Sequence, residues 1–95
     1  MSVVDDLKGA RERVEKGWCK HRLRDGQGNV CAVGAICLQT GAEMPARHPA
    51  AAQLRKFLPK EFGGEIADFN DARSTTKEDV LMLFDKALAD LGGLG

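Results

Sequence analysis

The chain has 95 residues, of which 43% are hydrophobic and 29% charged, the balance of an ordinary globular domain. This length predicts one domain, residues 1–95, and leaves no room for a two-domain enzyme. Fourteen basic residues balance fourteen acidic ones, and this neutrality disfavours a dedicated DNA-binding protein.

The charges are unevenly distributed along the chain. Residues 1–30 hold seven basic and five acidic residues, net +2, and residues 31–60 hold four and one, net +3. Residues 61–95 hold three basic and eight acidic residues, net −5. Such segregation predicts a polar partner surface, a self-complementary assembly, or charge pairing between the two halves of the molecule.

The sequence also indicates where in the cell the protein is located. No apolar run approaches the roughly 18 residues of a membrane span, so no membrane contact is expected. The first ten residues include Asp5 and Asp6 and lack an apolar stretch, which argues against a secretory signal. An odd number of cysteines fits a reducing compartment better than a disulfide framework. We therefore expect a cytoplasmic protein.

The first predicted helix begins after Ser2, a favourable N-cap residue with Asp5 three positions on. One apolar stripe follows at helical spacing, formed by Val3, Leu7, Ala10 and Val14. Gly17 is expected to end this helix, although residues 18–24 could continue it.

Residues 25–29 (Asp-Gly-Gln-Gly-Asn) predict a turn. The next nine residues, 30–38, carry no charge, are rich in alanine and do not alternate, which favours a buried helix over a strand. Gly41 lies where a C-terminal cap is expected, and Gly34 predicts the close approach of another helix. A small hairpin around residues 18–38 remains the alternative.

The remaining elements are short until the last helix. Residues 50–58 predict a helix that ends near Pro59, and residues 65–70 predict a single helical turn. The last helix has Thr75 as its expected cap, with Glu78 three residues on. Its apolar stripe consists of Val80, Phe84, Ala87 and Leu91.

These elements predict an all-α fold, a compact bundle of four to five short helices. The terminal helices are too short to be stable alone in water, so they need each other's apolar faces. The expected core consists of Leu7, Val14, Trp18, Val33, Ile36, Leu54, Phe57, Phe69, Leu81, Phe84 and Leu88.

Three segments stand out in order along the chain: residues 17–20 (Gly-Trp-Cys-Lys), 31–36 (Cys-Ala-Val-Gly-Ala-Ile) and 66–71 (Ile-Ala-Asp-Phe-Asn-Asp). With Thr75, Thr76 and residues 79–87, their spacing resembles a family of small actinobacterial and actinobacteriophage proteins catalogued as a domain of unknown function. The chain departs from that pattern at Phe69, where tryptophan is common, and in a shorter middle. The resemblance covers most of residues 10–91. It implies a bacterial or phage cytosolic protein, located in the host cytoplasm if phage-encoded, and implies no reaction.

Cysteine and histidine side chains could form a zinc site, because zinc binds four such ligands in tetrahedral geometry. The candidate ligands are Cys19, His21, Cys31 and Cys37. No Cys-x-x-Cys pair exists, so buried structural cysteines are the better interpretation. Basic neighbours could favour a Cys19 thiolate, but no second catalytic motif accompanies it. We expect no catalytic residue, no metal and no cofactor, and hence no enzyme.

Oxygen donors gather near residue 70, where a divalent cation could bind. The group consists of Glu65, Asp68, Asn70 and Asp71. The EF-hand order is absent, and short polar side chains more often cap local backbone. We expect Asp68 and Asp71 to accept from the amides of residues 72–75.

The sequence therefore predicts a small non-catalytic phage or bacterial protein that binds a host protein and modulates it by occlusion. The polar rim would come from the basic segment 16–24 or the acidic segment 65–79. The candidate partner-binding residues are Lys16, Lys20, His21, Arg22, Arg24, Glu65, Asp68 and Asp71. The alternative is a nucleic-acid-binding accessory protein that uses segment 16–24, with Trp18 as a stacking aromatic. An amphipathic last helix also leaves a homodimer open.

Overall fold

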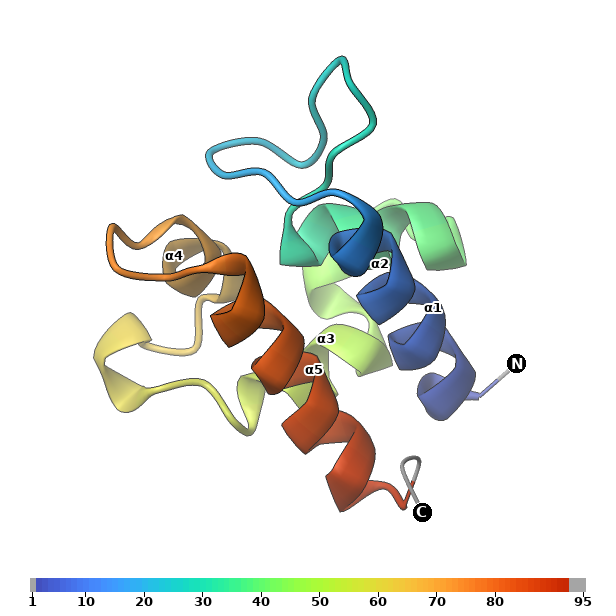
Figure 1. The fold of residues 1–95 in the computed structure, drawn as a ribbon. Coiled ribbons are helices and arrows are strands. Elements are labelled where there is room, and N and C mark those ends of the chain that lie inside the picture. Colours follow the sequence, from blue (N-terminus) through green and yellow to red (C-terminus); the bar gives the residue numbers. More distant parts are fainter. Residues whose placement is uncertain (1, 93–95) are drawn as a thin grey trace.

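The computed structural model describes residues 2–92, and two long helices frame it, with shorter helices packed between and beside them (Figure 1). The α-helices are α1 (Val3–Lys16), α2 (Ala32–Thr40), α3 (Pro49–Arg55), α4 (Ile66–Asp71) and α5 (Lys77–Asp90). Two single 3-10 turns lie between helices: η1 (Pro45–Arg47) between α2 and α3, and η2 (Lys60–Phe62) between α3 and α4. The all-α prediction is confirmed, because residues 2–92 contain no strand. None of the helices in this range is long and apolar enough to cross a membrane.

Residues 17–31 form a long loop, which we call the display loop, and it rises above the helices in Figure 1. The predicted hairpin alternative is wrong, because only isolated bridges join Val30 to Trp18 and to Arg24. Helix α1 ends at Lys16 and does not continue through residues 18–24. Its predicted cap is confirmed: the Ser2 side chain accepts from the Asp5 amide at 3.1 Å.

Helix α2 begins two residues later than the apolar run suggested. Its N-cap is Cys31, whose sulfur accepts from the Gly34 amide at 3.2 Å. Gly41 ends the helix with a φ of 72°, the left-handed C-cap conformation that was predicted. Gly34 was expected to face another helix, and that expectation is wrong. A Cβ on Gly34 would lie 1.8 Å from the Leu23 carbonyl oxygen of the display loop.

The cap of α5 is one residue later than predicted. Thr76, not Thr75, accepts from the Asp79 amide, and the Asp79 carboxylate accepts in return from the Thr76 amide, at 3.2 and 2.9 Å. Thr75 is buried, and its amide donates to Ala72 in the turn after α4. Both threonines have an acidic residue three positions on, so the local pattern could not separate them.

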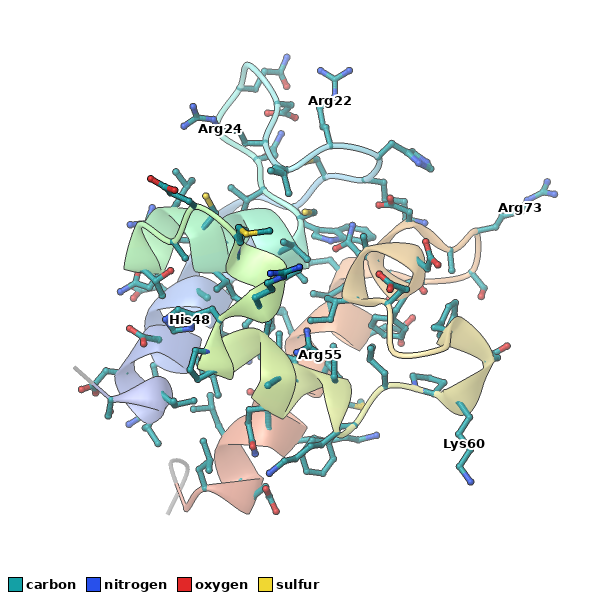
Figure 2. All side chains as sticks on the ribbon, turned by 180° about the vertical axis from the view of Figure 1, so that it is seen from behind. Arg22, Arg24, His48, Arg55, Lys60 and Arg73 are labelled. Atoms are coloured by element: carbon teal, nitrogen blue, oxygen red, sulfur yellow. The ribbon has the colours of Figure 1, made fainter. Side chains whose placement is uncertain are left out.

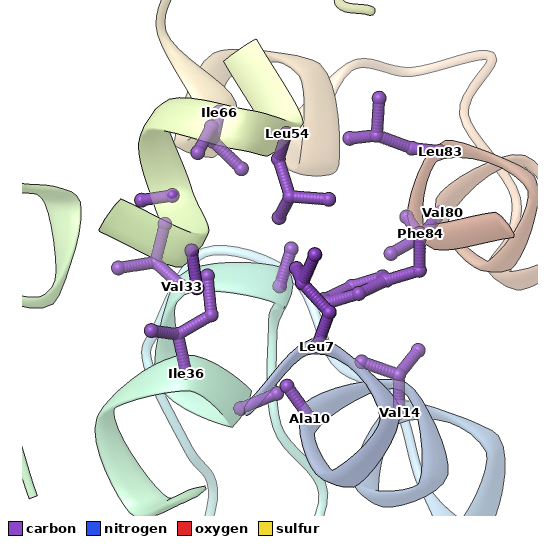
Figure 3. Close-up of a cluster of buried hydrophobic side chains, with 14 of the residues drawn as sticks. Leu7, Ala10, Val14, Val33, Ile36, Leu54, Ile66, Val80, Leu83 and Phe84 are labelled. Carbon is purple, nitrogen blue, oxygen red and sulfur yellow. The ribbon is translucent and has the colours of Figure 1, made fainter. Parts of the chain in front are cut away.

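One apolar core joins the helices around Phe84, which is fully buried (Figure 3). Leu7 and Val14 of α1 lie near Phe84 in Figure 3, and Ile36 of α2 and Leu54 of α3 belong to the same cluster. The Cα radius of gyration is 11.8 Å, near the roughly 12 Å expected for a domain of this length.

Several expected core residues lie at its margin instead. Trp18, Phe57 and Leu81 are only partly buried, and Leu83 takes the inward position on α5. Leu91, expected in the apolar stripe, is 40% exposed because α5 ends at Asp90.

The predicted charge pairing between the two halves of the chain occurs once between α1 and α5. The Arg11 guanidinium donates through Nε and Nη2 to the two carboxylate oxygens of Asp85. Hydrogen bonding to Asp85 raises the pKa of Arg11 above its ordinary value.

Candidate interaction face

A buried amide side chain fixes the display loop to the helices. Asn70 of α4 is fully buried, and its Oδ1 accepts from the Trp18 indole at 2.7 Å and from the Ala32 amide at 3.1 Å. Its Nδ2 donates to the Cys19 carbonyl at 3.1 Å and to the Asp71 carboxylate at 2.9 Å. One side chain thus joins α4, the display loop and the first turn of α2.

Backbone hydrogen bonds close the base of the display loop. Cys19 N–H donates to Val30 O, and Val30 N–H donates to Gly17 O, both at 3.0 Å. Cys31 N–H donates to Leu23 O, also at 3.0 Å. Because Gly34 has no Cβ, the Leu23 carbonyl lies directly against α2.

Lys20 and His21 of the display loop are hydrogen-bonded to the end of α4 and to the residue that follows it. The His21 amide donates to the Asp71 carboxylate at 2.8 Å, and the Lys20 ammonium donates to the Ala72 carbonyl at 2.7 Å. His21 has a φ of 69°, the only positive φ outside glycine in residues 2–92. Such a conformation persists where surrounding contacts determine it, and it is often found at functional sites.

The tip of the display loop is an Asx-type turn. The Asp25 carboxylate accepts from the Asn29 side chain and from the amides of Gln27 and Asn29, at 2.8 to 3.0 Å. These hydrogen bonds, the Asn29 side chain first, hold the pKa of Asp25 below its ordinary value. These hydrogen bonds therefore favour the ionised form of the carboxylate.

The side chains of residues 21–24 remain exposed while their backbone is held in this way. Arg22 and Arg24 project from the loop in Figure 2, and between them Leu23 is 50% exposed. Three surface depressions meet at Leu23, with volumes of about 380, 200 and 200 Å³. The largest lies between the loop, η1, α3 and α4, and Arg47 and Arg55 contribute to its lining.

We call this surface the Leu23 face. It consists of His21, Arg22, Leu23, Arg24, Val33, Cys37, Leu38, Ala46, Arg47, Arg55, Glu65, Ile66, Ala67 and Asp71.

The structure separates the predicted partner-binding residues into groups. His21, Arg22 and Arg24 lie on the Leu23 face, together with Glu65 and Asp71. The basic and acidic segments, proposed as separate rims, therefore adjoin one another.

Three other predicted residues lie elsewhere or are engaged. Lys16 is exposed at the end of α1, 3.9 Å from Glu12. The Lys20 ammonium is bound to Ala72 and lies 5.4 Å from the centre of the Trp18 ring. Asp68 is exposed on α4. The expectation that Asp71 caps residues 72–75 is wrong, because it accepts from the display loop instead.

Sequence reasoning missed Leu23, Arg47 and Arg55. The first had a visible signal, because it is the one apolar residue in the polar stretch 20–29. The two arginines had none, because they reach this face only through the packing of η1 and α3 against the loop.

The three cysteines are free thiols. Burial raises the pKa of Cys31 and, with help from the Asp25 carboxylate, that of Cys19. Neither shift favours the thiolate that a nucleophile or a metal ligand needs. Within residues 2–92, no three His, Cys, Asp or Glu side chains come together in a group suited to a metal ion.

Comparisons with known proteins give a family and no further relative. Neither the search of curated proteins nor the search of solved structures found a match. A family model does match, over residues 1–90, and it is described as a family of unknown function, DUF6197. The chain belongs to this family of unknown function.

Proposed function

We propose that this chain is a non-catalytic interaction module that binds a partner protein through the Leu23 face. The observation that supports this most is the contrast within residues 21–24. Their backbone is held by Asp71 and by the Cys31 amide, whereas their side chains are exposed. A segment fixed before binding loses little conformational entropy when a partner docks.

The composition of the face also suits a protein partner. Leu23 supplies an exposed apolar anchor, and Leu38 lines the neighbouring depression at 38% exposure. Arginines surround the anchor, and arginine is enriched in protein interfaces and among the residues that contribute most binding energy. A fixed apolar anchor with an arginine rim is the arrangement expected at the centre of a protein interface.

The proposed mechanism is occlusion. A domain that acts without catalysis would affect a host protein by covering a surface that the host protein uses. We place this action in the cytoplasm of a bacterium, with the protein encoded by the bacterium or by a phage. The family resemblance and the reducing environment implied by three free cysteines support that setting.

The nucleic-acid alternative has weaker support. The Trp18 indole N–H donates to Asn70, and the Lys20 ammonium lies 5.4 Å from the centre of the Trp18 ring. One face of the ring is therefore already occupied. Stacking on a base needs an accessible ring. The carboxylates of Glu65 and Asp71 on the same face would also repel phosphates.

Affinity capture from a nuclease-treated actinobacterial lysate, followed by reconstitution with the purified partner, tests the proposal. Leu23→Ser removes the apolar anchor and leaves the backbone contacts intact. Met82→Ser is the matched control, because Met82 is 55% exposed and lines a separate hollow on α5.

We expect one stoichiometric protein that is retained by wild type and by Met82→Ser. Leu23→Ser should weaken its measured affinity by about tenfold or more. Equal retention by all three proteins would contradict the proposal. Recovery of nucleic acid alone from a parallel untreated lysate, with affinity that falls steeply with salt, would favour the alternative.

A further inference from the structure

The largest depression of the Leu23 face has an apolar floor. Val33 of α2 and Ile66 of α4 form it and are 7% and 3% exposed. Leu23 lies on one side, and the whole groove measures about 380 Å³. This volume lies within the range of about 300–1,000 Å³ that is typical of ligand pockets, so a large apolar side chain and its adjoining backbone fit.

The charged side chains that line this groove are two arginines and one glutamate, so its lining carries a net positive charge. Arg47 and Arg55 line it on the side of η1 and α3, and Glu65 lines it at the start of α4. Arg55 is also fixed in place, because its Nη1 donates to the Ala46 carbonyl of η1. Arg55 lies below the loop that carries Arg22 and Arg24 in Figure 2.

A fixed guanidinium with remaining N–H groups matches the planar geometry of a carboxylate. Glu65 is the single acidic residue that residues 2–92 contribute to the lining, so the two arginines outnumber it. The groove therefore favours a segment that carries carboxylates over one that carries positive charge.

We propose that the groove binds an acidic segment of the partner protein. A bulky apolar side chain of that segment lies on Val33 and Ile66, beside Leu23. Aspartate or glutamate residues next to it pair with Arg47 and Arg55. This inference rests on the proposed function above and names the chemistry of the partner.

A second copy of this chain is the competing occupant. Residues 61–95 carry a net charge of −5, so another copy could supply carboxylates to the arginines. The acidic stretch has its carboxylates partly engaged, however. Asp71 accepts from His21, and Asp85 accepts from Arg11. Asp79 completes the cap of α5, which leaves fewer carboxylates for a second copy. We therefore favour a separate acidic protein.

Selection from a random peptide library displayed on phage tests the inference with the intact 95-residue chain as bait. The selected peptides are sequenced, synthesised and measured by fluorescence anisotropy. We expect enrichment of peptides in which aspartates or glutamates flank one large apolar residue. Their affinity should fall as the salt concentration rises.

Matched variants locate the binding site. Arg47→Glu and Lys60→Glu make the same charge change at exposed positions of two 3-10 turns, η1 and η2. Arg47→Glu should weaken peptide binding by about tenfold or more, and Lys60→Glu should leave it unchanged. Leu23→Ser should also weaken it.

The other outcomes overturn the inference in distinguishable ways. Selected peptides that are neutral or basic, but whose binding still requires Leu23, would show that the partner segment is not acidic. The proposed function would still stand. Peptides that bind independently of Leu23 would count against both.

An empty selection would overturn the inference as well. In that case light scattering separates two causes. A dimer that Arg47→Glu dissociates would assign the groove to a second copy, whereas a monomer would leave the groove without a protein occupant.

Discussion

The indole N–H of Trp18 donates to the side-chain oxygen of Asn70 at 2.7 Å, and this contact joins two segments 52 residues apart. The same oxygen accepts from the Ala32 amide, one of the orphan donors in the first turn of α2. A single buried amide therefore anchors the display loop and begins a helix. The exposed side chains of the Leu23 face depend on this anchor for their position.

Asn70→Asp is expected to destabilise the protein although it preserves the shape of the side chain. The new oxygen would face the Cys19 carbonyl and the Asp71 carboxylate, which now accept from Nδ2. We expect a loss of about 3 kcal/mol in the free energy of unfolding, because a buried donor is replaced by a repelling acceptor. Urea denaturation followed by Trp18 fluorescence measures it.

Asp68→Asn is the control for that substitution. Asp68 is exposed on the same helix, so the reverse exchange there should change stability by less than about 0.5 kcal/mol. A similar loss at both positions would show that Asn70 has no special role.

Gly34→Ala should destabilise the chain in spite of the better helix propensity of alanine. Propensity alone favours alanine by about 1 kcal/mol. The added Cβ would lie 1.8 Å from a backbone oxygen of Leu23, so the display loop must move. We expect a net loss of about 1–3 kcal/mol, typical of overpacking. Thermal melts followed by circular dichroism measure the change.

Gly26→Ala is the matched control, since no atom lies within 4 Å of the Cβ it would add. It should be neutral within about 0.5 kcal/mol. A higher melting temperature for Gly34→Ala than for the wild type would contradict the close approach of the Leu23 carbonyl to α2.

Local patterns were enough to predict most helix positions, and the reasons are physical, although the helix expected over residues 50–58 ends at Arg55. Helical spacing of apolar residues located α1 and α5, Ser2 marked the start of α1, and Gly41 marked the end of α2. Such signals act within one turn of the chain, so a single sequence carries them. The one-residue error at Thr76 arose because two adjacent threonines fit the same pattern.

The candidate site was less predictable because it depends on distant contacts. The display loop is held by Asn70 and Asp71, about fifty residues away, and nothing in the sequence pairs these segments. A glycine inside a helix predicts a close neighbour, but the sequence cannot distinguish a second helix from the loop carbonyl that lies there. The position of Arg55 beside Leu23 required the packed structure.

Thr76→Ala should cost about 1 kcal/mol, the usual effect of losing an N-cap side chain. Thr76 accepts from the Asp79 amide, and α5 carries Phe84, which lies at the centre of the core. Chemical denaturation at neutral pH measures the loss. Ser74→Ala, at an exposed position in the preceding turn, should be neutral. An equal loss at Ser74 would contradict the assignment of the cap to Thr76.

The stability of the protein should fall as the pH rises above the ordinary pKa of cysteine, about 8.5. Burial raises the pKa of the Cys31 thiol in the folded state. Above about pH 8.5 the unfolded chain loses this proton first, so it binds fewer protons than the folded chain and unfolding becomes more favourable. Below that pH both states keep the proton and the effect vanishes. The chain contains no tyrosine, which removes one competing alkaline titration.

Two substitutions at Cys31 separate this titration from its role as a helix cap. Its sulfur accepts from the Gly34 amide at the start of α2. Cys31→Ser keeps an acceptor at that position, whereas Cys31→Ala removes it, and neither side chain titrates. Both should reduce the alkaline fall in the urea midpoint under reducing conditions, and Cys19, whose pKa burial also raises, accounts for a remaining part. Only Cys31→Ala should also lose about 1 kcal/mol at neutral pH, because it lacks the cap. An alkaline slope as steep in both variants as in the wild type would mean that groups other than the Cys31 thiol produce it.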